Sequence, residues 1–299
     1  MSVLVVGSAA LDSVKTPYGE VKDAIGGSAF YFAAAASFFA PVKLVAVVGE
    51  DFPIRRLDFL KKRNVDMTGL EIAPGKTFHW AGVYHPDMNQ RDTLATELNV
   101  FETFSPKLPP EYRNTAYVFL ANIHPELQME VLKQVARPRL VMLDTMNLWI
   151  STALPALKKV MARTDAVILN DQEARQLTGE VNIIKAAKDV TKLGPKTVIV
   201  KKGEHGAFLV RGEDFFAIPA YPLESLFDPT GAGDSFAGGL MGYIAARGEQ
   251  GFGILKRAMG FGTVVASFAV EKFSIDRLKE LSRDEIEERF EKFEGMTRF

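Results

Sequence analysis

The sequence predicts an α/β fold in which helices cover both faces of a mostly parallel sheet. Three observations support this class. Short apolar runs rich in β-branched residues alternate with helix-like periods, most regularly from residue 116 onward. Polar residues follow several of these runs, as they do at the carboxyl ends of parallel strands. A hydrophobic fraction of 47% in 299 residues supports a substantial core. We find no repeats or low-complexity linkers, so residues 1–299 are expected to form one domain.

The composition excludes several classes of protein. The 36 basic and 37 acidic residues nearly cancel, so the net charge gives no sign of nucleic-acid binding. The absence of cysteine excludes disulfides and thiol chemistry, and the four histidines lack metal-ligand spacing. No apolar run is long enough for a membrane span, and the apolar N-terminus lacks the basic residues of a signal peptide. The protein is therefore expected to be soluble and cytoplasmic, with no nucleic-acid or membrane partner.

The N-terminal part begins with a buried strand at residues 3–7. Asp12 follows near its carboxyl end, where ligands bind in open α/β sheets. A turn residue is the other interpretation of Asp12. Segments 13–17 and 20–24 alternate weakly on either side of a turn and predict a small hairpin.

The pair Gly26-Gly27 then precedes an Ala- and Phe-rich run, 28–40, which predicts a buried helix. A strand at 42–48 and a helix at 53–63 follow, with Asp51 expected to cap the helix.

Residues 66–104 have a different pattern. Strand-like pieces at 70–72, 77–84 and 93–98 alternate with Gly, Pro, Asp and Asn. Together with 13–24 they predict a small antiparallel sheet. Several polar side chains in this region are interpreted as ordinary surface: His79, Tyr84, Asn89, Gln90 and Arg91.

From residue 116 the chain alternates regularly between strands and helices. Strands are predicted at 117–120, 140–143, 166–169 and 197–200, and helices at 126–136, 151–162, 171–178 and 182–193. Right-handed crossovers place all the carboxyl ends of parallel strands at one edge of the sheet. The residues expected to meet at that edge are Asp12, Asn122, Asp144, Asn170, Lys201 and the loop 228–234.

The C-terminal third predicts a hairpin and three helices. The hairpin joins 198–202 to 207–210 through Gly203 and Gly206, and a further strand lies at 215–218. Helices are predicted at 236–246, 255–268 and 283–293, the last of them amphipathic, acidic and solvated.

The loop Asp228-Pro229-Thr230-Gly231-Ala232-Gly233-Asp234 carries the strongest chemical signal. Small residues that open a helix bring unpaired backbone N–H groups close to a ligand, at the positive end of the helix dipole. Such a loop binds a phosphate, and a carboxylate beside it can take a proton from a hydroxyl. We therefore interpret Asp234 as a general base. A helix cap beside a tight turn is the competing interpretation.

Four motifs, in order along the chain, resemble those of the ribokinase (PfkB) family of carbohydrate kinases. The loop 228–234 resembles the family's anion hole with its catalytic aspartate. Gly26-Gly27-Ser28-Ala29 resembles its glycine pair. Asn170-Asp171-Gln172-Glu173 and Lys202-Gly203-Glu204-His205-Gly206 resemble two further elements. The resemblance implies a ribokinase-like three-layer α/β/α fold with a small β-sheet lid, formed by about 13–24 and 66–104, which is often a dimer contact.

The resemblance also implies roles for residues of this chain. Asp234 would be the base, and the amides of Gly231, Ala232 and Gly233 the anion hole. The acceptor would contact residues from several elements, namely Asp12, Gly26, Gly27, Tyr31, Asn122 and Asp144. ATP would contact Asn170, Glu173, Lys202, Gly203, Gly206 and Thr230. Asn170 and Glu173 would bind Mg²⁺ through water, although this pair also fits a reciprocal helix cap. In some relatives a monovalent cation such as K⁺ lies near Asp228 and Thr230.

Two positions depart from the family pattern. Tyr31 stands where many sugar kinases have an Asn that contacts the substrate. The patch Asp144-Thr145-Met146-Asn147-Leu148 has its Asn one residue late and no final Arg, with Trp149 near that place, which disfavours acidic sugars.

The predicted function is ATP-dependent phosphoryl transfer to a hydroxyl of a small sugar. A nucleoside kinase of the same fold is the main alternative, because Tyr31 lies within an aromatic cluster at 30–32 and the catalytic groups act on a hydroxymethyl that both acceptors share. A non-catalytic sensor is a further alternative, although it would need neither Asp234 nor the loop glycines. A nicotinamide-dependent dehydrogenase is disfavoured because no G-x-G-x-x-G follows the first strand.

Overall fold

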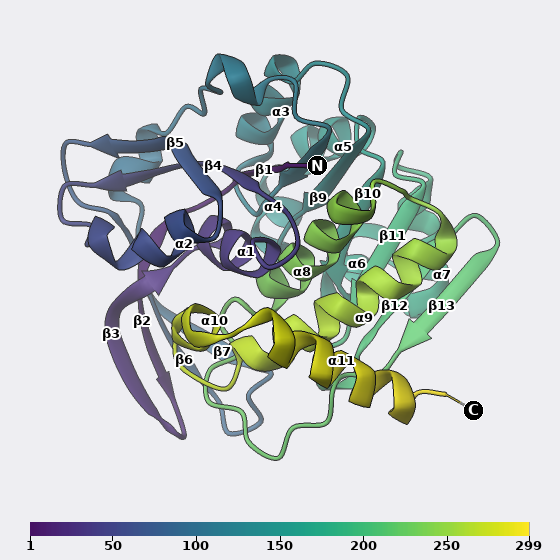
Figure 1. The fold of residues 1–299 in the computed structure, drawn as a ribbon. Helices are drawn as coiled ribbons and strands as arrows, with labels where there is room; N and C mark the ends of the chain where they lie inside the picture. Colours follow the sequence, from purple (N-terminus) through teal and green to yellow (C-terminus); the bar gives the residue numbers. More distant parts are fainter. Residues whose placement is uncertain (299) are drawn as a thin grey trace.

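The computed structural model describes residues 1–298 and contains a large sheet between two layers of helices, with a smaller sheet beside it (Figure 1). The large sheet has nine strands. From one edge to the other they are β13 (Asp214–Ile218), β12 (Ala207–Arg211), β11 (Thr197–Lys201), β10 (Ala166–Asn170), β9 (Leu140–Asp144), β8 (Tyr117–Leu120), β1 (Val3–Val6), β4 (Val42–Gly49) and β5 (Val65–Ala73). The seven strands from β11 to β5 are parallel, and only β12 and β13 run antiparallel to their neighbours.

Alternate strand residues form two separate hydrophobic cores. Val3 and Val5 of β1 belong to one core, and Leu4 and Val6 belong to the other, because successive side chains point to opposite faces of a sheet. The first core is covered by α1 (Ser28–Ala36), α2 (Asp58–Lys62), α8 (Ala232–Arg247), α9 (Phe252–Ala269), α10 (Asp276–Glu280) and α11 (Arg283–Met296). The second is covered mainly by α3 (Pro125–Gln134), α5 (Leu154–Met161), α6 (Asp171–Thr178) and α7 (Ile183–Thr191). The predicted three-layer α/β fold is confirmed.

The smaller sheet forms a lid of four strands in the order β3 (Gly19–Gly26), β2 (Ala10–Thr16), β6 (Phe78–Tyr84) and β7 (Arg91–Glu97). The pairs β2–β3 and β6–β7 are antiparallel, but β2 and β6 are parallel. The prediction that residues 70–72 belong to the lid is wrong, because β5 pairs with β4 in the large sheet. The pairing of β5 with β4 is a tertiary contact, and the local pattern of residues 70–72 does not reveal it.

Several predicted helices differ at their ends. The helix predicted at 151–162 is interrupted at Ala153 and consists of α4 (Asn147–Thr152) and α5, because Pro155 fits only the first turn of a helix. Asp51 does not cap the helix at 53–63; its carboxylate accepts hydrogen bonds from the amide and hydroxyl of Thr77, 2.8 and 2.6 Å away. The helix predicted from 236 begins at 232, so its first turn includes Asp234.

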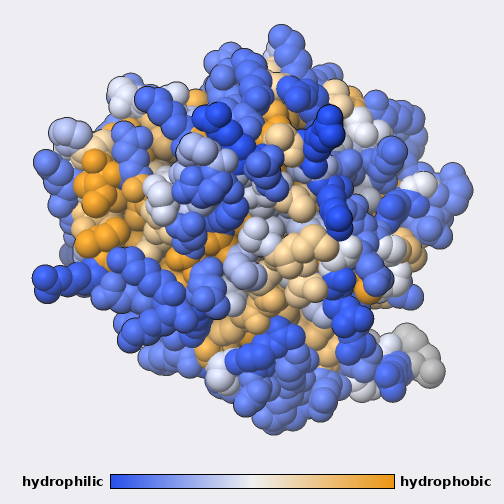
Figure 2. Space-filling view, turned by 45° about the horizontal axis from the view of Figure 1, so that its top comes forward, coloured by the Kyte–Doolittle hydropathy of each residue, from blue (hydrophilic) through white to orange (hydrophobic). Residues whose placement is uncertain are grey.

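The surface is largely hydrophilic, with a few hydrophobic patches on the face shown in Figure 2. This mixture agrees with the near-zero net charge of the chain. Among residues 1–298, none of the helices has both the length and the apolar character of a membrane span.

Candidate active site

The predicted strand-end residues meet where β9, β10 and β11 end beside the start of α8. The Nζ atom of Lys201 lies 3.7 Å from Oδ1 of Asp144. A Cβ atom placed on Gly233 would lie 2.9 Å from the same Nζ, so the lysine side chain contacts the anion loop. Burial lowers the pKa of Lys201, but the carboxylates of Asp144 and Glu173 outweigh it and raise that pKa above its ordinary value. Lys201 is therefore a fixed positive charge beside the loop.

The anion loop turns sharply at Gly231, which has φ of 75° and precedes α8. A side chain there would be strained, and its Cβ would lie 2.3 Å from the ring of Tyr31. The amide of Ala232 donates to the carbonyl of Pro229 at 3.2 Å. Within residues 1–298 the amides of Gly231 and Gly233 have no protein acceptor. The turn thus engages the amide of Ala232 and leaves those of Gly231 and Gly233 open, and the binding of an anion by the three amides stays a prediction.

Asp234 is the third residue of α8, and the N-cap position of this helix is Gly231. The interpretation of Asp234 as a cap is therefore wrong. Burial and the neighbouring carboxylate of Asp144 raise the pKa of Asp234 to about 7, although Lys201 and Arg91 act in the opposite direction. A carboxylate with a pKa near 7 can accept a proton from a hydroxyl at neutral pH.

Asp12 lies directly over the glycine pair at the end of β3. A Cβ atom on Gly26 would lie 1.8 Å from Oδ2 of Asp12, so only glycine allows this approach. The side chain is 6% exposed, and burial together with Asp228 and Asp234 raises the pKa of Asp12 to about 8. The structure therefore brings Asp12, Gly26 and Gly27 close to the catalytic candidate. Contact of these residues with an acceptor stays a prediction.

Tyr31 is 2% exposed and packs its ring under Gly231. Burial, with Asp228 and Asp12 nearby, raises the pKa of the Tyr31 hydroxyl well above its ordinary value. The flanking Phe30 and Phe32 stack on Phe52 and Phe119 in the core, as expected for Phe32. Tyr31 thus supports the anion loop from below and is surrounded by carboxylates.

Asn170 and Glu173 form the capping box that the sequence allowed. Oδ1 of Asn170 accepts from the amide of Glu173, and Oε2 of Glu173 accepts from the amide of Asn170, both at 2.7 Å. Burial raises the pKa of Glu173 to about 7, with Lys201 lowering it and Asp144 raising it. Among the described residues no group of three or more His, Asp and Glu side chains could hold a metal ion by itself. One Glu173 oxygen stays outside the cap, and this suits a metal held mainly by phosphate and water.

Asp228 shapes the loop. Its side chain is 1% exposed, Oδ1 accepts from the amide of Thr230 at 2.9 Å, and Oδ2 accepts from the amide of Ser274 at 3.1 Å. Both carboxylate oxygens thus have backbone partners. The monovalent-cation role of Asp228 stays a prediction.

Asn122 is already engaged by its neighbours. Its Oδ1 accepts from the indole N–H of Trp149 at 2.8 Å, and its amide donates to the sulfur of Met146 at 3.1 Å. The side chain therefore holds Trp149 in place, and direct contact with an acceptor stays a prediction.

The hairpin after β11 begins with two lysines. Lys201, the last residue of β11, pairs with Asn170 and lies near the carboxylates, whereas Lys202 follows the end of the strand, and its contact with ATP stays a prediction. Gly203 and Gly206 have positive φ and form the predicted turn. The lid also reaches this hairpin, because the side-chain amide of Asn89 donates to the carboxylate of Glu204 at 3.2 Å.

Tyr84 was wrongly interpreted as ordinary surface, whereas Arg91 is exposed as expected but lies near the site. The hydroxyl of Thr230 in the anion loop donates to the buried hydroxyl of Tyr84 at 3.2 Å. Arg91 is close enough to lower the pKa of both Asp234 and Glu173. Strand alternation from Phe78 to Tyr84 was the available signal, but it could not tell which face of the lid meets the site.

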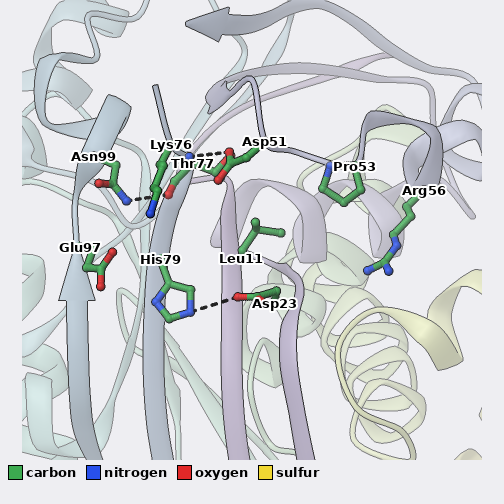
Figure 3. A pocket seen from close by; sticks show the side chains of 10 residues that line it. All are labelled: Leu11, Asp23, Asp51, Pro53, Arg56, Lys76, Thr77, His79, Glu97 and Asn99. Atoms are coloured by element: carbon green, nitrogen blue, oxygen red, sulfur yellow. Dashed lines mark hydrogen bonds and ion pairs between the residues drawn. The ribbon is translucent and has the colours of Figure 1, made fainter. Parts of the chain in front are cut away.

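A cavity of about 530 Å³ lies on the other face of the lid (Figure 3). Leu11 and His79 line it, and these two residues pair directly, one position away from Asp12 and Trp80 on their strands. His79 contacts Asp23 at 3.4 Å there. Because alternate residues face opposite sides, this cavity is separate from the catalytic candidates.

A buried carboxylate with a raised pKa at a helix start, beside open amides and a buried lysine, is suited to phosphoryl transfer to a hydroxyl, and a covering lid is typical of a small-molecule kinase. Residues 2–279 match the pfkB family carbohydrate kinases. The chain belongs to this family, and it is a kinase whose acceptor group is a hydroxyl. The resemblance inferred from the four motifs is confirmed.

Proteins similar to most of this chain include nucleoside kinases and ribokinases. A cytidine kinase from Thermococcus kodakarensis is 31% identical over 255 residues, which are 83% of this chain and 90% of that protein. The crystal structure of a Methanocaldococcus jannaschii nucleoside kinase, an archaeal member of the ribokinase family, has a TM-score of 0.77 at 22% identity and covers 97% of this chain and 98% of that one. An Arabidopsis thaliana ribokinase in complex with ribose and ATP has a TM-score of 0.77 at 23% identity, covering 96% and 98%. The ribokinase-like fold is confirmed.

Proposed function

We propose that this protein is an ATP-dependent nucleoside kinase that phosphorylates the primary hydroxyl of the ribose. The observation that carries the proposal is the 31% identity to a cytidine kinase, which extends over 83% of this chain. A pyrimidine nucleoside such as cytidine is therefore the first acceptor to test.

Asp234 takes the proton from the acceptor hydroxyl as the hydroxyl oxygen bonds to the γ-phosphorus of ATP. The bond from that phosphorus to the β–γ bridging oxygen breaks, and ADP leaves. The open amides of Gly231 and Gly233, with the ammonium of Lys201, stabilise the charge that develops on the transferred group. Arg91 adds a positive charge from the lid side.

Asp12 is suited to hold the hydroxyls of the acceptor. Its pKa of about 8 leaves the carboxyl protonated at neutral pH before a ligand binds, so that it can both donate and accept hydrogen bonds. Gly26 and Gly27 allow this position, because a Cβ on Gly26 would clash with Asp12 and a Cβ on Gly27 would clash with the backbone of Ser8.

Mg²⁺ would be held through water by the free oxygen of Glu173 and the side-chain oxygen of Asn170, and it would neutralise phosphate charge. The capping box holds both side chains in place before any metal binds.

The proposal also includes a K⁺ site near Asp228 and Thr230 and a homodimer formed through the lid. The outer lid strands β3 and β7 pair on one side only within the lid sheet.

A free sugar is the second candidate acceptor. Ribose and ribonucleosides share the hydroxymethyl group on which Asp234 would act, and the ribokinase noted above has the same fold. A non-catalytic sensor would bind the same ligands without turnover. An assay of turnover with both kinds of acceptor therefore separates the nucleoside kinase, the sugar kinase and the sensor.

The test is ADP release with ATP and Mg²⁺ against cytidine, uridine, adenosine, inosine, ribose, fructose and sugar acids. We expect the highest kcat/KM with a nucleoside. Asp234→Asn should lower kcat by at least ~10²-fold. Asp276→Asn, which changes an exposed carboxylate in the first turn of α10, is the matched control. Turnover of free sugars alone would move the sugar kinase ahead, and ligand binding without turnover would favour the sensor.

A further inference from the structure

One face of the lid points toward the catalytic groups, and the strand register identifies its residues. Asp12 of β2 pairs directly with Trp80 of β6, and this parallel register continues without a shift to Lys15 and Val83. Paired residues lie on the same face, and every second residue of a strand returns to it. Trp80, Gly82 and Tyr84 therefore share the face of Asp12. The contact of Tyr84 with Thr230 shows that this face meets the anion loop.

The indole of Trp80 is held flat on this face. A Cβ atom on Gly82 would lie 2.4 Å from Cη2 and Cζ2 of the indole, so the ring lies against the backbone where a side chain is missing. The indole N–H donates to the hydroxyl of Thr93 at 3.3 Å. The guanidinium of Arg91 lies 5.8 Å from the ring centre. Gly82 is buried beneath the ring, whereas Trp80 remains partly exposed.

We propose that Trp80 determines acceptor specificity by forming the surface on which the base of the nucleoside stacks. This inference rests on the proposed nucleoside kinase function. Asp12 and Trp80 are neighbours on one face, so a ribose held by Asp12 has its attached base beside the indole. A base offers a large planar face to an aromatic ring, whereas a free sugar does not. Trp80 thus separates nucleosides from sugars, a distinction that the catalytic residues themselves do not make.

The kinetic test compares Trp80→Ala and Trp80→Phe with the wild type, using cytidine and ribose as acceptors. We expect Trp80→Ala to lower kcat/KM for the nucleoside by ~10- to 100-fold, mainly through KM, because stacking on one aromatic ring has about this effect. The KM for ATP and kcat/KM for ribose should stay near wild type, and Trp80→Phe should retain most of the preference. Leu94→Ala is the matched control, because this lid residue is 67% exposed.

A second readout uses intrinsic fluorescence. The chain has only two tryptophans, Trp80 and Trp149. Addition of cytidine without ATP should change the emission of the wild type and of Leu94→Ala, and Trp80→Phe should lose that change. If Trp80→Ala does not fold, Gly82→Ala keeps the tryptophan but displaces the ring from its place, and it should raise the KM for cytidine in the same direction.

The outcomes separate the two proposals. A wild type that phosphorylates cytidine, with Trp80→Ala unchanged or equally impaired on ribose and cytidine, overturns the role of Trp80 and leaves the nucleoside kinase intact. A wild type that phosphorylates no nucleoside overturns both.

Discussion

Asp234 has a pKa of about 7, and two neighbours of opposite charge act on it. Asp144 raises this pKa, because a second negative charge disfavours ionisation, and Lys201 lowers it. Each neighbour comes from a different strand, so the protonation of the base depends on how the strand ends of the sheet are arranged.

We expect Asp144→Asn and Lys201→Met to move the acid limb of the kcat/KM profile in opposite directions. In the wild type activity falls as pH drops through about 7, where Asp234 becomes protonated. Loss of the Asp144 charge lowers the pKa of Asp234 and moves the limb to lower pH. Loss of the Lys201 charge raises that pKa and moves the limb to higher pH. Limbs that shift together, or do not shift, would show that another group controls the profile.

The capping box at the start of α6 combines a structural part with a proposed metal part. Substitution can separate the two, because Gln keeps an oxygen that accepts from the amide of Asn170 but carries no charge.

Glu173→Gln should retain the thermal stability of the wild type and raise the Mg²⁺ concentration needed for half-maximal activity. Glu173→Ala should also need more Mg²⁺, and its free energy of unfolding should be lower by about 1 kcal/mol, because it removes the cap as well as the charge. The measurements are Mg²⁺ titrations of activity and denaturant unfolding. If Glu173→Gln leaves the Mg²⁺ titration unchanged, Glu173 has only the structural role of capping α6.

The last helix, α11, is bound to the core rather than solvated as the sequence suggested. Ile286, Phe290 and Phe293 are buried, and the ring of Phe290 stacks on Phe261 of α9 with centroids 3.9 Å apart. The acidic residues of the helix predicted its exposed face, whereas its apolar face packs against α9.

Phe290→Ala should lower the free energy of unfolding by about 3–5 kcal/mol, because it removes a buried ring and leaves a cavity. Glu291→Ala, on the exposed face of the same helix, should change it by less than about 0.5 kcal/mol. Urea unfolding measures both. A small effect of Phe290→Ala would mean that α11 is not part of the cooperative core.

At the scale of the whole molecule, the fold concentrates buried carboxyl groups at one site. Asp12, Glu173 and Asp234 all have pKa values raised to about 7 or 8, first by burial. For an acid whose pKa is higher in the folded state, stability is fully present below the unfolded pKa and is lost as pH rises through the folded pKa.

The protein without ligands should therefore lose stability between about pH 4 and pH 8, and Asp12→Asn should reduce that loss. The Tm advantage of the variant over wild type should grow as pH rises across this window, corresponding to a few kcal/mol at most. Thermal unfolding at a series of pH values measures it, with Asp276→Asn as control. An advantage that does not depend on pH would contradict the buried-carboxylate explanation.

The sequence by itself determined the α/β class, most strands and helices, and the loop that carries Asp234. These features depend on the local period of apolar residues and on glycine and proline at turns. Both patterns can be recognised in the sequence without knowledge of tertiary contacts. The capping box of Asn170 and Glu173 was predicted for the same reason, since its geometry is set within four residues. Gly26-Gly27 was predicted from the family resemblance, and its close contacts are with Asp12 and Ser8 on other parts of the chain.

Only the tertiary structure decided which groups face the site. It placed Lys201 beside the carboxylates, engaged the amide of Ala232 within its own turn, and placed Trp80, Tyr84 and Arg91 on the inner face of the lid. Thr230 meets Tyr84 across 146 residues of chain. A local pattern shows that a strand has two faces, but the partners that it meets determine which face is buried, and burial beside those partners sets the pKa values of the carboxyl groups.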